Sequence, residues 1–274
     1  MRTDGDPELV RRGAEMLASF RERVLDNAGP IEGQTLLDVG CGEGLIAFGA
    51  LERSAATVVF SDISRDLLDF CRDGATELGI LERCRFVEAP ADDLAGIEDE
   101  SVDVVTTRSV LIYVTDKQAA FREFARVLRP GGRISLFEPI NRFGQSPGTF
   151  WGFDLSAIPE IVGKLRAVYD AIQPPETDPM LDFDERDLIA YAEDAGFHPI
   201  RLQLEAEIQP SQPTPWESFL GRAGNPRIPP IGDLLNQALT ASEREELAER
   251  LRPLVEEGGG TWRMASAFLY AVKP

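Results

Sequence analysis

The sequence predicts an α/β protein built on a doubly wound, mostly parallel β-sheet. Short apolar segments alternate with segments of helical periodicity over residues 35–138, which is typical of a parallel sheet with helices on both faces. The segment Leu36-Leu37-Asp38-Val39 is followed at once by Gly40-Cys41-Gly42-Glu43-Gly44. This order predicts a buried strand that turns sharply into a helix beginning near Leu45.

The elements of the first half follow in a regular order. Residues 7–27 have apolar side chains at helical spacing, and we expect a helix that either packs on the sheet edge or closes over a ligand as a flap. After the first strand, at 35–39, the predicted elements are a helix to about residue 51, a strand at 58–62, a helix at 64–78, strands at 84–88 and 102–107, a helix at 116–128 and a strand at 133–138.

The second half is less regular. Residues 141–154 are rich in Gly and Phe and predict a loop or flap, and residues 173–182 form a proline-rich connector. The remaining predictions are helices at 156–172 and 184–195, a strand at 199–208, an insertion at 210–260 that is helical over 242–255, and a strand at 262–272. We therefore divide the chain into an N-terminal helical flap (1–30), a core (31–140), a loop, helices and sixth strand (141–209), a helical lid insertion (210–260) and a last core strand (261–274).

The glycine turn has the properties of a nucleotide-binding corner. Gly40 and Gly42 lack a Cβ atom, so their backbone N–H groups can approach a ligand closely. Asp62 ends the second predicted strand at about the 20-residue offset where a carboxylate accepts hydrogen bonds from ribose hydroxyl groups. An alternative for Asp62 is capping of the following helix, for which Ser64 is also suited.

Polar and charged residues gather at the carboxyl ends of the predicted strands. In a parallel sheet these ends share one edge, where ligands bind. The residues concerned are Asp38, Asp62, Asp92, Arg108 and Glu138. This clustering predicts a ligand site at that edge.

The amino-acid composition restricts the classes of partner that the protein can bind. The formal net charge is −19, from 47 acidic and 28 basic residues, and there is no long basic segment. Such a charge disfavours nucleic acid as a partner. The three cysteines, Cys41, Cys71 and Cys84, have neither disulfide-framework nor metal-site spacing, and no long apolar run predicts a membrane span. We expect a cytoplasmic protein without a metal site, whose oligomeric state the sequence leaves open.

The order of motifs resembles that of the class I, seven-stranded S-adenosylmethionine-dependent methyltransferases. Residues 36–44 are similar to the first motif of this family, with glycines at alternate positions. Residues 91–94, 101–105 and 126–132 resemble its later signatures. The resemblance is dense from Thr35 to Glu138 and elsewhere rests on element order alone. The glycine spacing argues against a nicotinamide-dependent dehydrogenase.

The resemblance implies a sheet order of 3-2-1-4-5-7-6 with an antiparallel seventh strand. It also implies S-adenosylmethionine as cofactor, with Asp62 on the ribose, Ile63 beside the adenine, and Asp92 accepting from the adenine amino group. Cys41 is expected to contribute its backbone rather than its thiol. The full predicted cofactor-binding set is Asp38, Gly40, Cys41, Gly42, Asp62, Ile63, Ala91, Asp92, Asp93, Arg108 and Ser109.

The chain departs from the family after the fourth strand, where many relatives have a histidine. Here the segment is Val110-Leu111-Ile112-Tyr113-Val114, so no histidine base can be assigned. Tyr113 and Glu138 are the candidate catalytic residues, although Glu138 also suits a capping or ion-pair role and Tyr113 a packing role. The single histidine, His198, is expected at the surface away from the chemistry.

The variable segments are expected to recognise a small methyl acceptor under the helical lid. The predicted substrate-binding residues are Tyr113, Phe143, Trp151, Tyr169, Trp216 and Phe219, with Phe150 as a further aromatic side chain. Transfer to an oxygen, nitrogen or carbon atom is left open. A protein methyltransferase and a non-catalytic regulatory protein that binds S-adenosylmethionine are the alternatives.

Overall fold

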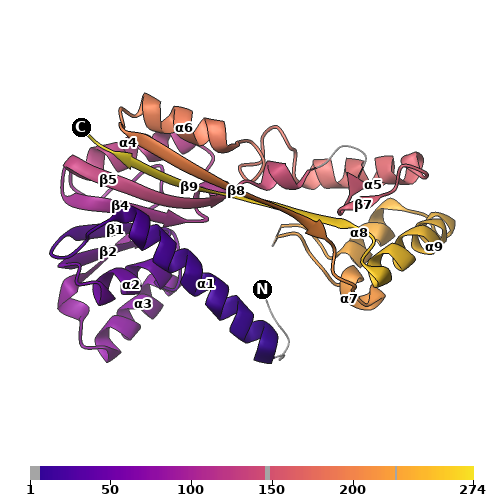
Figure 1. Ribbon diagram of the computed structural model, residues 1–274, viewed down its shortest axis with the longest axis horizontal. Helices are drawn as coiled ribbons and strands as arrows, with labels where there is room; N and C mark the ends of the chain where they lie inside the picture. The colour runs from indigo at the N-terminus through magenta and orange to yellow at the C-terminus, as the bar shows by residue number, and fades with distance from the viewer. Residues whose placement is uncertain (1–6, 146–148, 226) are drawn as a thin grey trace. The chain divides into compact units, whose positions relative to one another are not determined.

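Figure 1 presents a computed structural model of the protein, which describes residues 7–145, 149–225 and 227–274; the side chains of 7–10 and 12–14 are outside the description. The chain divides into two compact units. The core unit comprises Met1–Pro139, Glu185–Leu204 and Ser266–Pro274, and the second unit comprises Ile140–Asp184 and Glu205–Ala265. Parts of the predicted flap (1–6), loop (146–148) and insertion (226) lie outside the described residues.

The sheet of the core unit has seven strands in the order β3-β2-β1-β4-β5-β9-β8, which confirms the predicted order. Its strands are β1 (Thr35–Val39), β2 (Thr57–Asp62), β3 (Cys84–Glu88), β4 (Val102–Arg108), β5 (Leu128–Pro139), β8 (Ile200–Pro210) and β9 (Thr261–Val272). β1 to β5 pair in parallel, and β9 is antiparallel to β5, with Phe137 opposite Phe268. β9 is thus the predicted seventh strand, and β8 is the sixth.

Helices of the core unit pack on this sheet because its strands are apolar on both faces. In β1, Leu36, Leu37 and Val39 are all buried. The helices are α1 (Pro7–Ala28), α2 (Leu45–Glu52), α3 (Arg65–Glu77), α4 (Lys117–Val127) and α6 (Glu185–Asp194), with the short 3₁₀ segments η1 (Leu81–Arg83) and η2 (Leu111–Tyr113). The Ser64 hydroxyl accepts a hydrogen bond from the Leu67 N–H and caps α3, so Ser64 rather than Asp62 performs this role.

The fifth strand begins five residues earlier than predicted. Leu128 pairs with Val102, and the register then shifts before Arg133 pairs with Val104. Gly131, at φ +78°, donates its N–H to the carbonyl of Lys273 at the end of the chain. The Pro-Gly-Gly sequence therefore forms an irregularity within a strand rather than a loop before it.

The second unit contains most of the remaining helices and a two-stranded hairpin. Its elements are η3 (Asn141–Gly144), β6 (Thr149–Phe150), β7 (Phe153–Asp154), α5 (Pro159–Ile172), α7 (Trp216–Leu220), α8 (Ile231–Ala238) and α9 (Ala241–Glu257). The predicted loop 141–154 thus contains a hairpin. α5 begins three residues later than predicted, at a proline that is well suited to the first helical position.

The helix α1 joins the core unit through its carboxyl-terminal half. Val24, Leu25 and Ala28 are fully buried there, and the Ser135 hydroxyl donates to the Val24 carbonyl at 2.7 Å. Met16 and Leu17, earlier in the helix, are exposed. The predicted helix is therefore present, and its role as a flap stays a prediction. In the part of the chain that the structure describes, no helix is both long and apolar enough to span a bilayer.

We expect Leu25→Ala to lower the free energy of unfolding by about 2–5 kcal/mol, because the removed methyl groups leave a cavity in the core. Leu25 is 0% exposed and Leu17 on the same helix is 38% exposed, so Leu17→Ala is the matched control and should change stability by less than about 1 kcal/mol. Urea unfolding followed by circular dichroism measures both. Equal losses in the two variants would mean that α1 does not pack as described.

Candidate functional site

A tight glycine turn joins the end of β1 to the start of α2. Gly40, Gly42 and Gly44 have φ values of 64°, 54° and 82°, a left-handed conformation that other residues rarely adopt. A Cβ atom on Gly40 would lie 2.4 Å from Val110 Cγ2, whereas one on Gly42 would meet nothing within 4 Å. The turn is thus closed against Val110 and leaves open space beside the backbone at Gly42.

The Asp38 carboxylate holds this turn in place through two hydrogen bonds. One carboxylate oxygen accepts from the Thr106 hydroxyl at 2.9 Å, and the other accepts from the Ala47 N–H at 3.2 Å. Burial raises the pKa of Asp38 to about 7. Because its oxygens bind β4 and α2, Asp38 positions the glycine turn rather than facing solvent.

Asp62 links the turn to the end of β2. Its carboxylate accepts from the Gly42 N–H at 2.9 Å and from the Ser64 N–H at 2.9 Å. Each oxygen retains a lone pair for a further donor. The next side chain, Ile63, is 73% exposed, so an apolar surface stands beside this carboxylate.

The Cys41 thiol in the turn is not poised to react. Cys41 donates its backbone N–H to Ser61 O, and its carbonyl accepts from the Gly44 N–H. A hydrogen bond with Cys71, together with burial, raises the pKa of the Cys41 thiol and keeps it protonated. That Cys41 contributes its backbone to a ligand site stays a prediction.

The acidic turn after β3 is held by a polar network that sequence reasoning missed. The Ala89 N–H donates to Asp62 O at 3.1 Å, so the segment with Ala91, Asp92 and Asp93 starts beside the end of β2. Of these three residues, Ala91 is buried, Asp92 half-buried and Asp93 exposed.

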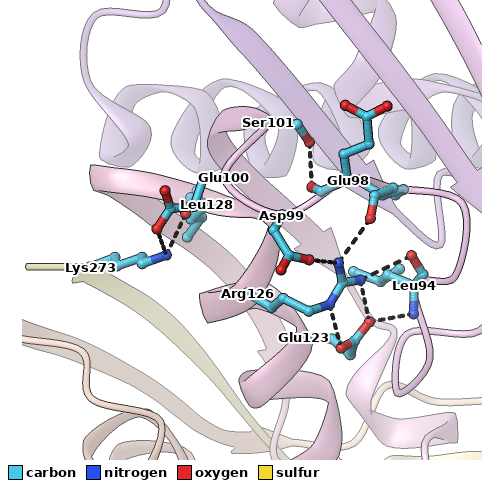
Figure 2. A network of polar contacts seen from close by, with 10 residues as sticks. Leu94, Glu98, Asp99, Glu100, Ser101, Glu123, Arg126, Leu128 and Lys273 are labelled. Atoms are coloured by element: carbon cyan, nitrogen blue, oxygen red, sulfur yellow. Dashed lines mark hydrogen bonds and ion pairs between the residues drawn. The ribbon is translucent and has the colours of Figure 1, made fainter.

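Figure 2 shows how Arg126 of α4 reaches this segment: its guanidinium donates to the Leu94 carbonyl and pairs with Asp99 and Glu123. It also donates to the Ile97 carbonyl at 2.9 Å. Glu123 in turn accepts from the Leu94 N–H at 2.8 Å. Its bond to Arg126 lowers the pKa of Glu123. No local pattern signals this role, because the partners other than Glu123 lie about 30 residues away in sequence.

The segment after β4 is positioned by Glu138. This side chain is fully buried, and it accepts from the Thr107 hydroxyl at 2.9 Å and from the N–H groups of Val110 and Leu111 at 3.1 Å each. Burial raises its pKa to about 7, although the hydrogen bonds oppose the shift. The arrangement fits the capping role, since Glu138 binds the start of η2.

The side chains around η2 differ in exposure. Tyr113 is 53% exposed and therefore accessible to a ligand. Arg108 is half-buried at the end of β4, where its charge lowers the pKa of Asp38 against the effect of burial. Ser109 has a φ of 58° and donates its N–H to Phe137 O at 2.8 Å. His198 is exposed, as expected.

The second unit contains a separate cavity of about 960 Å³. Trp151, Tyr169 and Phe219 of the predicted substrate-binding set line it, together with Phe150. Trp216 does not line it and stacks on Phe219 instead, with ring centroids 5.6 Å apart. Phe143 does not line it either.

The strand order and glycine turn define the core unit as a Rossmann-like methyltransferase fold. Comparison with known proteins adds a sequence match: residues 37–136 match the model described as a methyltransferase domain. The recognition made from the sequence is therefore confirmed.

Three proteins illustrate the similarity. Methyltransferase GfsG of Streptomyces halstedii is 33% identical over 137 residues, which are 50% of this chain and 49% of that protein. A geranyl diphosphate methyltransferase in complex with S-adenosylmethionine superposes with a TM-score of 0.57 at 21% identity, covering 100% of this chain and 93% of that one. The [4+2]-cyclase SpnF superposes with a TM-score of 0.55 at 19% identity, covering 94% and 80%.

These similarities differ in what they establish. The structural matches show the fold, and because one of the matched proteins is a cyclase, the fold alone does not define the chemistry. The chain spans about half the length of the curated relatives that it matches first.

We expect Glu138→Gln to change how stability depends on pH. The folded-state pKa of about 7 lies above the ordinary value of 4.5, so the folded protein binds more protons between these values and loses stability as pH rises through this window. Removing this carboxyl should reduce the slope by up to about 1.4 kcal/mol per pH unit. Denaturant unfolding at several pH values from about 5 to 7.5 measures the slope. Glu160→Gln, at an exposed glutamate of α5, is the control, and unchanged slopes in both variants would contradict the prediction.

We expect Arg126→Met to loosen residues 91–99, because four hydrogen-bonded or ion-paired groups lose their common partner. Amide hydrogen exchange in peptides covering this segment should accelerate by roughly tenfold or more. Arg122→Met is the control, since Arg122 lies on the same helix but is exposed, with a 3.7 Å ion pair to Asp116. If both variants exchange at the wild-type rate, Arg126 does not hold the turn.

Proposed function

We propose that the protein is an S-adenosylmethionine-dependent methyltransferase that acts on a small molecule at an oxygen, nitrogen or carbon atom. The observation that carries this proposal is the pairing of the glycine turn with Asp62 at the ends of adjacent strands. The match of residues 37–136 to a methyltransferase domain supports it.

The residues at this edge fit the proposed cofactor. Open space beside Gly42 can admit a ligand next to the backbone, and the free lone pairs of Asp62 suit the two hydroxyl groups of a ribose. The exposed side chain of Ile63 offers an apolar surface for adenine. Asp92, Asp93, Arg108 and Ser109 complete the proposed set, with Asp38 acting through the turn.

When bound, S-adenosylmethionine would supply an electrophilic methyl group on a sulfonium. The chain would hold the acceptor in line with that methyl group and exclude water, and such positioning is worth at most about 7–11 kcal/mol of the barrier. An acceptor that must lose a proton would also need a base, which contributes about 10²–10⁴ in rate. Tyr113 is the accessible candidate for this role. Glu138, which is fully buried with three donors on its carboxylate, is better suited to hold η2.

The second unit supplies the proposed acceptor site. Its aromatic cavity suits a small organic molecule better than a protein side chain with its backbone, which favours the small-molecule proposal over a protein methyltransferase. That residues 210–260 act as a lid and that the protein is cytoplasmic are parts of this proposal.

We expect Asp62→Ala to weaken S-adenosylmethionine binding by about tenfold or more, because hydrogen bonds to a charged acceptor are lost. Asp66→Ala removes an exposed carboxylate from the first turn of the next helix and should leave the affinity unchanged. Isothermal titration calorimetry measures both variants.

The same titration separates the cofactor classes. The wild-type protein should bind S-adenosylmethionine and S-adenosylhomocysteine but not NAD. Binding of NAD alone, or unchanged affinity in Asp62→Ala, would refute the cofactor assignment. Tight cofactor binding with no S-adenosylhomocysteine formed from any metabolite would instead favour a non-catalytic binding protein or, if basic proteins are methylated, a protein methyltransferase.

A further inference from the structure

The cavity of the second unit is bounded entirely by residues of that unit. Its wall is formed by η3, the β6–β7 hairpin, α5, the end of α7, one residue of α9 and the adjoining ends of β8 and β9. At about 960 Å³ it is at the upper end of the range for small-molecule sites. The site therefore accommodates a ligand larger than a single aromatic ring.

Aromatic side chains make one wall apolar and rigid. The Trp151 ring lies 4.5 Å from the Phe150 ring and 5.8 Å from the Phe219 ring, centroid to centroid. The Trp151 indole N–H donates to the Tyr169 hydroxyl at 2.9 Å. Since these polar groups bind each other, this wall offers a ligand mainly apolar contact.

The hairpin turn holds Trp151 in an unusual conformation. Trp151 and Gly152 have φ values of 52° and 84°, as in the tight turns of two-residue hairpins. The Gly152 carbonyl accepts from the Thr261 N–H at 2.8 Å, and a Cβ atom on Gly152 would lie 2.3 Å from Thr261 O. A bulky residue with positive φ costs free energy. Here the close contact between Gly152 and Thr261 holds Trp151 in this conformation.

The charge of the cavity is opposite to that of the chain. Among the described residues, its lining contains one carboxylate, Asp170, and the four arginines Arg142, Arg166, Arg222 and Arg263. The whole sequence has 47 acidic and 28 basic residues. The excess of guanidinium groups is thus a local feature of this cavity.

Two of these arginines lack a side-chain partner in the part of the chain that the structure describes. Within the described residues, neither Arg142 nor Arg263 forms an ion pair or side-chain hydrogen bond. Arg263 is half-buried at the start of β9, and its guanidinium N–H groups are available to an anion. Arg166 and Arg222 donate to neutral oxygens, those of Thr149 and Thr214, and Arg166 also lies over the Phe150 ring.

We propose that this cavity binds an amphipathic anion, an organic molecule with an extended apolar body and a carboxylate or phosphate group that Arg142 and Arg263 bind. Guanidinium groups recognise both anions through paired N–H donors, and the aromatic wall takes up the apolar body. The inference rests on the proposed function in one respect: the amphipathic anion is the methyl acceptor.

The test uses three probes with the same apolar body, biphenyl-4-carboxylate, biphenyl-4-yl phosphate and the neutral biphenyl-4-methanol. Each is titrated calorimetrically into the full chain without S-adenosylmethionine, in buffer free of phosphate. At least one anion should bind about tenfold or more tightly than the alcohol, and comparison of the two anions identifies the preferred group. Raising NaCl from about 50 to about 300 mM should reduce that difference.

Substitutions of cavity arginines test whether the tighter binding of the anions takes place in the cavity. Arg263→Gln and Arg142→Gln should each weaken anion binding by about tenfold and leave alcohol binding within about twofold. Arg142 is exposed, so Arg142→Gln serves the test even where Arg263→Gln fails to fold. Arg252→Gln is the matched control: Arg252 lies on α9 in the same unit, outside the cavity lining, and pairs with Glu256.

The outcomes separate the two proposals. Absence of binding by all probes, equal affinity for anion and alcohol, or equal losses in Arg252→Gln and Arg142→Gln would overturn the anion site. Selective anion binding in a protein that fails to bind S-adenosylmethionine would retain the anion site and remove the methyl-transfer function. Cofactor binding without selective anion binding would retain the methyl-transfer function and remove the anion site.

Discussion

The left-handed turn between β1 and α2 is the constraint on which the candidate site depends. Three glycines at alternate positions adopt positive φ values, so that the backbone can reverse direction and expose N–H groups at the sheet edge. Buried carboxylates hold this turn from two neighbouring strands: Asp38 binds the β4 and α2 side, and Asp62 binds the Gly42 N–H. The open space at Gly42 exists because these bonds keep the turn in place.

Much of the polar chemistry around the site serves to position backbone rather than to react. Glu138 fixes the start of η2, and Val110 in that segment closes against Gly40. Arg126 fixes the acidic turn after β3 through a network shared with Glu123 (Figure 2). A reaction that depends on alignment more than on proton transfer requires such fixed segments. This is consistent with a site whose candidate base is the exposed Tyr113.

The two units differ in their electrostatic character. At the sheet edge of the core unit the prominent groups are carboxylates, which suit the hydroxyl and amino groups of a nucleoside. In the second unit, arginines and packed aromatic rings line the cavity. The acidic surface of the protein repels anions, whereas the guanidinium groups of this cavity attract them. The two units thus offer different chemical surroundings to a ligand.

The sequence by itself determined the parallel core, because the alternation of apolar strands with helices and the glycine turn are local patterns with short-range causes. It also determined that Asp38, Asp62 and Glu138 stand at strand ends. Tertiary structure decided what these carboxylates bind, since their partners come from other strands and loops. It likewise decided that Phe150, Trp151, Tyr169 and Phe219 share a cavity that excludes Trp216. The arginines of that cavity come from four segments far apart in sequence, and only folding brings distant segments into contact.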